Sequence, residues 1–335
     1  MIQLAEVTGE AWLVDPLALA DLASLGAVTA DERVCVILHA GSNDLVHLKR
    51  RHGFRFARIF DTSIAARFLG GANLGLDTVL TTYLGVELPP SRQRDDWSVR
   101  PLSEAQERYA MADVLHLIAL AARLREELTA RGRLSWVEEE CEALATQPAP
   151  ERVEDPDAYA RLKGARELPP RGLGALRELH ELRERLALAA DRPPFKILGD
   201  ATLVALAQQL PGDRPALAAV PGCSSRVIER WGSDILAAIA RAPDQAPAIS
   251  ALAPRGRRPS AAARHRVEVL RRWRAGVAER TGLEPGLVLP NRLIGAIAEA
   301  VPRDLAALAL VEGMRQWRVD AFGVEVLAAL ATIGP

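Results

Sequence analysis

The sequence predicts an α/β domain followed by two copies of one small all-helical domain. Strand and helix signals alternate over the first third of the chain, which is typical of an α/β domain. Strand signals almost vanish after Leu134, and the remaining chain repeats itself at an offset of 91 residues. The expected domains are residues 1–145, 165–242 and 260–333, joined by Pro- and Ala-rich linkers at 146–157 and 242–260.

The elements of the α/β domain follow from short apolar runs and helical spacing. Ile2–Val7 and Ala11–Val14 flank the pair Thr8-Gly9 and predict a hairpin. The run Val34–Leu38 is apolar at every position, so we expect a strand buried on both faces. Helical patterns are expected at 44–51, 63–69 and 76–84, and a longer helix follows the capping box that opens at Ser103.

The internal repeat is carried by matched apolar, proline and glycine positions. Matched prolines and glycines predict the same element boundaries, and matched apolar positions predict the same buried stripe. We therefore expect a helical part, about residues 155–335, that folds apart from the α/β domain. The matched pairs include Leu179 with Leu270, Leu182 with Trp273, Leu186 with Val277, Pro194 with Pro285, Pro211 with Pro302, Gly222 with Gly313 and Gly232 with Gly323.

Composition excludes several classes of protein. The net charge of −1 does not fit a generic binder of polyanions. No apolar run reaches the roughly 20 residues that span a bilayer, so we expect no membrane partner. Cys35, Cys141 and Cys223 form no CxxC pair, which argues against a zinc site or disulfide framework and favours a reducing cytoplasm. The sequence has no GxxxxGK, which excludes an ATP-driven motor.

Two segments carry candidate catalytic residues. Asp44 ends the segment HAGSND directly after a predicted strand, so we expect it in the first turn of a helix. Tyr109 and Asp113 are four positions apart on one helix and therefore point the same way. Carboxylates are ligands that Mg²⁺ and Mn²⁺ prefer, and a neighbouring Tyr can orient a metal-held water. Taken singly, such an Asp is usually a helix cap and such a pair is usually surface decoration.

Together and in this order, the two segments resemble the DEDD superfamily of exonucleases. HAGSNDL is similar to the second exonuclease motif and YAMAD to the third motif in its Tyr-containing form. Three further stretches, at 59–70, 83–102 and 132–140, resemble the ribonuclease D family in particular, and the repeated unit resembles the HRDC domain. The resemblance implies a ribonuclease H-like α/β exonuclease domain and two divalent ions, Mg²⁺ or Mn²⁺. It further implies that Asp44 and Asp113 bind metal and that Tyr109 orients the water.

One motif of that pattern is missing. The family's first motif, Asp-x-Glu on the opening strand, has no counterpart before Asp44. In the implied sheet this strand lies between Ile2–Val7 and Val34–Leu38. Without it, we expect either that Ile2–Val7 shifts to pair with Val34–Leu38 or that the domain folds poorly, because two inner edges lose their partners. We favour a start codon placed too far downstream over a truncated, inactive protein.

A basic tract opens the second repeat. From Arg255 to Arg274 there are eight arginines against one acid, Glu268. This indicates a surface that contacts phosphates, although a solvated linker followed by an ordinary helix, with Trp273 in the core, would give the same pattern. The candidate nucleic-acid-binding residues are His39, Asn43, Arg257, Arg258, Arg271 and Arg272.

The leading hypothesis is a metal-dependent 3′→5′ exoribonuclease that trims RNA such as tRNA precursors. The resemblance alone suggests tRNA. A catalytically inactive RNA-binding protein of the same fold and a DNA 3′→5′ exonuclease remain as alternatives. We expect a cytoplasmic monomer.

Overall fold

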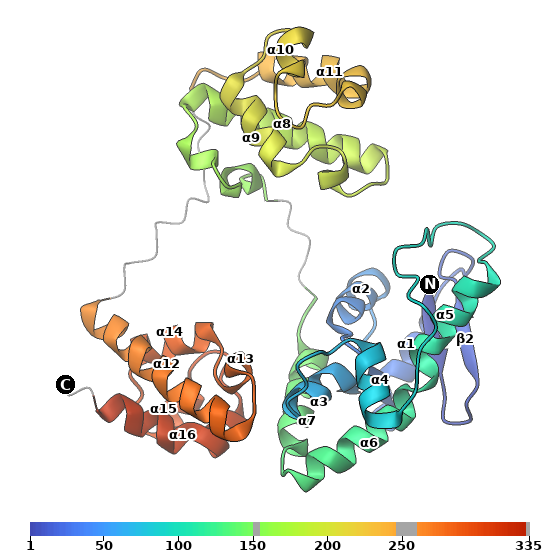
Figure 1. Cartoon of the computed structure of the whole chain (residues 1–335), viewed down its shortest axis with the longest axis vertical. Helices are drawn as coiled ribbons and strands as arrows, with labels where there is room; N and C mark the ends of the chain where they lie inside the picture. The colour runs from blue at the N-terminus through green and yellow to red at the C-terminus, as the bar shows by residue number, and fades with distance from the viewer. Residues whose placement is uncertain (150–154, 246–259, 333–335) are drawn as a thin grey trace. The chain divides into compact units, whose positions relative to one another are not determined.

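The computed structural model describes residues 1–149, 155–245 and 260–332 (Figure 1). The chain forms two units, Met1–Glu151 together with Pro259–Pro335, and Arg152–Arg258. The second helical repeat therefore belongs to the same unit as the α/β domain, and the first repeat forms the other unit. Within the described residues, no helix is long and apolar enough to cross a membrane.

The predicted strands and helices of the α/β domain occur in the predicted order (Figure 1). The helix Ala23–Ala30 and the strand Arg58–Asp61 were not predicted, and the single long helix expected after Ser103 is divided at His116 into two helices. The capping box at Ser103 and Gln106 is confirmed, and Gly53 and Gly85 end helices in the left-handed conformation. Its elements are β1 (Ile2–Ala5), β2 (Ala11–Val14), α1 (Ala23–Ala30), β3 (Cys35–Leu38), α2 (Ser42–His52), β4 (Arg58–Asp61), α3 (Thr62–Phe68), α4 (Leu76–Leu84), α5 (Glu104–Leu115), α6 (Leu117–Ala130) and α7 (Leu134–Thr146).

The strands of this domain form two separate pairs. β1 and β2 are antiparallel, with Ile2 opposite Val14, and α5 packs along this hairpin. β3 and β4 are parallel, with Cys35 opposite Arg58. Among the described strands, β1 does not pair with β3, so the expected shift of Ile2–Val7 does not occur.

The burial of β3 differs from the prediction. Each of its residues, Cys35–Leu38, is only half-buried, although the apolar run predicted a strand covered on both faces. The reason is that the edge of β3 opposite β4 has no neighbouring strand among the described residues. The domain nevertheless closes a core around β4, where Phe60, Phe68, Leu120 and Leu124 are fully buried.

The first repeat packs its helices around α8. Leu176, Leu179, Leu182 and Leu203 fill its core. Its elements are the 3₁₀ turns η1 (Ala158–Arg161) and η2 (Ala165–Glu167), then α8 (Pro170–Ala189), the 3₁₀ turn η3 (Pro194–Lys196), α9 (Asp200–Gln209), α10 (Arg214–Ala218) and α11 (Ser225–Ala240).

The second repeat has the same architecture, which confirms the predicted duplication. Its last three helices begin and end 91 residues after α9, α10 and α11. Leu210 and Val301 both adopt a left-handed conformation at the end of the equivalent helix, with φ of 47° and 49°. Its elements are α12 (Ala261–Thr281), α13 (Pro285–Val288), α14 (Asn291–Ala300), α15 (Leu305–Ala309) and α16 (Gln316–Ala331).

The second repeat is packed against α7 of the α/β domain. The rings of Trp136 and Trp317 stack, with centroids 4.9 Å apart and planes 19° apart. The ring of Phe68 meets Trp317 edge-on at 5.2 Å. One hydrophobic core runs through both parts. The expectation that both repeats fold apart from the α/β domain therefore fits the first repeat but not the second.

Candidate active site

The turn that presents Asp44 is fixed by a carboxylate on the next strand. Asp61, 1% exposed at the end of β4, accepts hydrogen bonds from the backbone N–H groups of Ala40 at 3.1 Å and Gly41 at 2.9 Å. It also caps α3 by accepting from Ser63 N at 2.9 Å. Sequence reasoning missed this residue, although Asp-Thr-Ser after an apolar run is a typical helix start.

Asp44 lies in the first turn of α2, as predicted. The N-cap of this helix is Gly41, and no side chain caps it, so the interpretation of Asp44 as a cap is wrong. Burial by the surrounding protein raises the pKa of Asp44, and the neighbouring His47 opposes this in part. A hydrogen bond from the backbone N–H of Asp44 to its own carboxylate also opposes the rise in pKa, and the residue is exposed in the first turn of the helix.

Tyr109 and Asp113 lie on α5, and the alternative that they decorate the surface is wrong. Tyr109 is 7% exposed, and its ring lies 6.2 Å from that of Trp97. Asp113 is half-buried, and burial raises its pKa to about 6. A cation placed beside this carboxylate would lower the pKa again, because opposite charge favours the ionised form.

The two proposed nucleic-acid contacts near α2 differ from each other. His39 is held internally: its Nε2–H donates to the carbonyl oxygen of Leu74 at 2.9 Å, and its Nδ1 lies 2.9 Å from the hydroxyl of Thr62. Burial lowers the pKa of His39, and both ring nitrogens are occupied. Asn43 is exposed in the first turn of α2 beside Asp44.

The metal site implied by the resemblance is incomplete. Among the described residues, no three or more His, Cys, Asp or Glu side chains come together as metal ligands. Asp15, an acid near the start of the chain, forms an ion pair with Arg100 at 2.6 Å, which lowers the pKa of Asp15. Asp44 and Asp113 are hard oxygen ligands suited to Mg²⁺ or Mn²⁺. They do not by themselves provide a closed two-ion site.

The basic tract of the second repeat is described only in part. Arg257 and Arg258 lie outside the described residues. Arg271 and Arg272 are exposed on α12, with Arg271 lying 3.6 Å from Glu268. Trp273 is half-buried, packs edge-on against Phe322 and donates to Glu325 at 3.0 Å, which agrees with its interpretation as a core residue.

Comparison with known proteins decides the family. A model of a 3′-5′ exonuclease family matches residues 1–129, and an HRDC domain model matches 172–239 and 263–330. The ribonuclease D of Granulibacter bethesdensis is 35% identical over 314 residues, which cover 92% of this chain and 77% of that protein. The ribonuclease D of Gluconacetobacter diazotrophicus is 35% identical over 98% of this chain and 82% of its own length. The chain belongs to the ribonuclease D family.

Solved structures agree with this family and with the predicted fold class. Escherichia coli RNase D, described as an exoribonuclease involved in structured RNA processing, matches with a TM-score of 0.69 and 26% identity. The match covers 98% of this chain and 88% of that one. A protein from Bifidobacterium adolescentis matches with a TM-score of 0.70 and 25% identity over 92% of this chain and 83% of its own. The predicted ribonuclease H-like domain followed by two HRDC domains is confirmed.

Proposed function

We propose that this protein is a 3′→5′ exoribonuclease that hydrolyses phosphodiesters at RNA 3′ ends, with tRNA precursors as substrates. The observation that carries the proposal is the match to ribonuclease D over almost the whole chain, including both HRDC domains. The nuclease domain would occupy residues 1–145 and the HRDC domains 165–242 and 260–333. The free cysteines suit the cytoplasm of a bacterial cell.

Asp44 and Asp113 form no ion pair within the described part of the chain, which supports their catalytic roles. Asp44 and Asp113 would hold two divalent ions, Mg²⁺ or Mn²⁺, together with the acids of an Asp-x-Glu strand. Such ions supply Lewis-acid activation of water and of the leaving 3′-oxygen. Tyr109 would orient the attacking water from its buried position one helical turn before Asp113.

A second candidate function is RNA binding without catalysis. It is favoured by one observation, the lack of a group of three metal-ligating side chains among the described residues. The two candidates differ in what an added Asp-x-Glu strand would do. It would complete the site of an enzyme, whereas a protein that only binds RNA would gain nothing.

The experiment compares this chain with a variant that carries an Asp-x-Glu strand ahead of Met1. A 5′-labelled single-stranded RNA and the DNA of the same sequence are digested with Mg²⁺ or Mn²⁺. We expect trace activity at most from the 335-residue chain and stepwise shortening of RNA from the extended variant, because both ions must be placed for turnover. Preference for the DNA would identify a DNA exonuclease instead.

Substitutions in the extended variant test the individual roles. Asp44→Asn and Asp113→Asn should each nearly abolish turnover, because each removes a ligand charge while keeping the shape. Tyr109→Phe should cost about 10²–10⁴ in rate, as for a positioned group that acts on a proton. Glu107→Gln, the same change at an exposed position of α5, is the control and should have no effect. Near wild-type rates in either Asn variant would contradict the assignment.

A further inference from the structure

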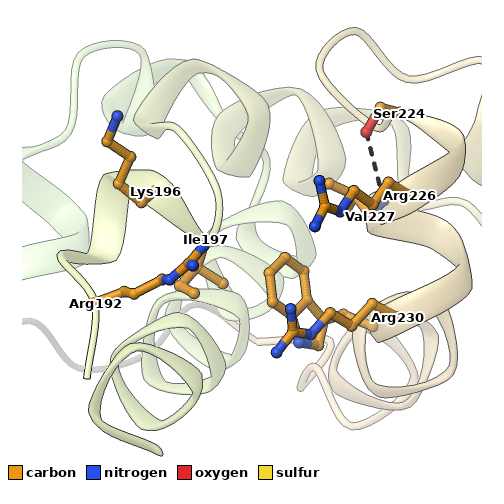
Figure 2. A pocket seen from close by; sticks show the side chains of 8 residues that line it. Arg192, Lys196, Ile197, Ser224, Arg226, Val227 and Arg230 are labelled. Atoms are coloured by element: carbon orange, nitrogen blue, oxygen red, sulfur yellow. Dashed lines mark hydrogen bonds between the residues drawn. The ribbon is translucent and has the colours of Figure 1, made fainter. Parts of the chain in front are cut away.

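The first repeat contains a pocket whose walls are basic. The pocket has a volume of about 170 Å³ and lies between η3 and the start of α11. Figure 2 shows Arg192 and Lys196 on one side and Arg226 and Arg230 on the other. Together these four residues form the basic pocket. The remaining lining residues are Ile197, Ser224, Val227 and Trp231.

The four cations of the basic pocket are exposed and unpaired. None of them forms an ion pair with another residue in the described part of the chain. Other arginines of this repeat do have partners: Arg177 pairs with Glu181 at 3.0 Å and Arg241 with Glu178 at 3.0 Å. Like charges gathered around one hollow repel one another, and a bound anion would relieve that repulsion.

The equivalent face of the second repeat shows what this position in the fold can bind. Adding 91 places Ser224 on Arg315, Arg226 on Trp317 and Val227 on Arg318. There, Glu139 of α7 accepts hydrogen bonds from the backbone N–H groups of Gln316 at 2.5 Å and Trp317 at 2.8 Å. The same face therefore already holds a carboxylate in one of the two copies.

The side chains around the two faces differ in a way that selects the ligand. Arg192 and Lys196 correspond to Leu283 and Leu287, which are buried in the second repeat, and Arg230 corresponds to Ala321. The face of the second repeat carries two arginines, Arg315 and Arg318, and both pair with Glu140 of α7, whereas the four cations of the first repeat have no acidic partner among the described residues. Such a charge density matches phosphates better than single carboxylates.

An exposed aromatic ring adjoins the basic pocket. Phe195 lies between Pro194 and Lys196 on η3 and is 65% exposed. The ammonium group of Lys196 lies 5.6 Å from the centre of this ring. Its counterpart in the second repeat is Gly286, so this ring also belongs to the first repeat alone. A ring beside a basic groove is the usual platform for a base of a single-stranded nucleic acid.

We propose that the basic pocket binds backbone phosphates of single-stranded RNA, with Phe195 stacking on an adjoining base. The choice of RNA over DNA rests on the proposed exoribonuclease function. The binding itself does not, because it needs neither metal nor a complete active site. The first repeat would hold the RNA strand while the equivalent face of the second repeat holds the nuclease domain.

Binding of a fluorescent 12-nucleotide single-stranded RNA by the full chain tests the proposal. Anisotropy is measured in EDTA at several salt concentrations. EDTA prevents hydrolysis of the RNA, so differences in catalytic activity between variants cannot affect the result. Replacing the four residues of the basic pocket with Ala should weaken binding about tenfold or more. It should also flatten the log–log salt dependence by about 0.7 for each phosphate that the protein no longer neutralises. Phe195→Ser should weaken binding while leaving the salt slope unchanged, because no charge is removed.

The control removes four paired arginines from the same repeat. Each is exposed and in an ion pair, so the net charge of the chain changes equally: Arg161, Arg171, Arg177 and Arg241. Equal weakening of binding in the control would overturn the proposal by attributing the effect to net charge. Displacement of the RNA by oligoglutamate of equal charge would overturn it in favour of an acidic protein partner. Unchanged binding in the basic-pocket variant, with an unchanged circular dichroism spectrum, would also overturn it.

Discussion

The two HRDC repeats have the same interior and different exteriors. In the first repeat, Arg183 of α8 bonds Asp200, the first residue of α9, at 2.6 Å. In the second repeat, the equivalent Arg274 of α12 bonds Asn291, the first residue of α14, at 3.0 Å. On the face formed by the last helix, the first repeat carries Arg226 where the second carries Trp317. The difference shows that the core was preserved after duplication, whereas a few surface positions determine what each repeat contacts.

The largest expected effect concerns the face of the second repeat that α7 covers. Trp317→Ala should lower the free energy of unfolding by about 3–5 kcal/mol, because a side chain only 3% exposed leaves a cavity between α7 and α16. Its counterpart Arg226→Ala should change the stability by less than about 0.5 kcal/mol, since that side chain is exposed. Urea denaturation of both variants measures the difference. Equal effects at the two positions would break the comparison.

A smaller effect is expected from the ion pair between α7 and the second repeat. Glu140 accepts from Trp317 Nε1 at 3.0 Å and pairs with the buried Arg318 at 2.9 Å. Glu140→Gln should cost about 1.5–3 kcal/mol, because Arg318 stays buried without a charged partner. The same change at Glu138, whose partner Arg125 is partly exposed, should cost less than about 1 kcal/mol. If both changes cost the same by thermal denaturation, Arg318 does not depend on α7.

The smallest effect concerns the shared interior. Exchanging the acceptors, with Asp200→Asn in the first repeat and Asn291→Asp in the second, should lower and raise stability respectively. Each change should be less than about 1 kcal/mol, because the Asp200 side chain is 64% exposed and water screens the pair. Both effects should shrink in high salt. Stability changes of opposite sign in the two repeats would support the equivalence of the two arginine contacts, whereas changes of the same sign would contradict it.

The duplicated interior was predictable from sequence because the residue types that the backbone requires recur at the same positions in both repeats. Prolines and glycines mark where a helix starts or a left-handed residue is needed, and these positions recur at Gly222 and Gly313 with φ of 88° and 82°. The place of Asp44 in a first helical turn was predictable for the same local reason. In these cases the determining residues lie within a few positions of one another.

Other features could not be predicted because their causes are distant in the chain. The half-burial of β3 depends on whether a strand lies at its second edge, which the run Val34–Leu38 does not encode. The contact of Trp317 with Trp136 depends on two segments that are separated in the chain by the whole first repeat. The occupied nitrogens of His39 depend on Thr62 and Leu74, from two other segments.

The packing of the second repeat on α7 makes the first repeat an inserted domain. The chain leaves the nuclease unit after α7 and returns to it at α12, so the first repeat is connected covalently at both ends to one folded body. A single cut between the first repeat and either neighbour would leave all three parts associated, because the second repeat is retained by its contacts rather than by the backbone. Only two cuts would release the first repeat, and the second repeat would then remain with the nuclease domain.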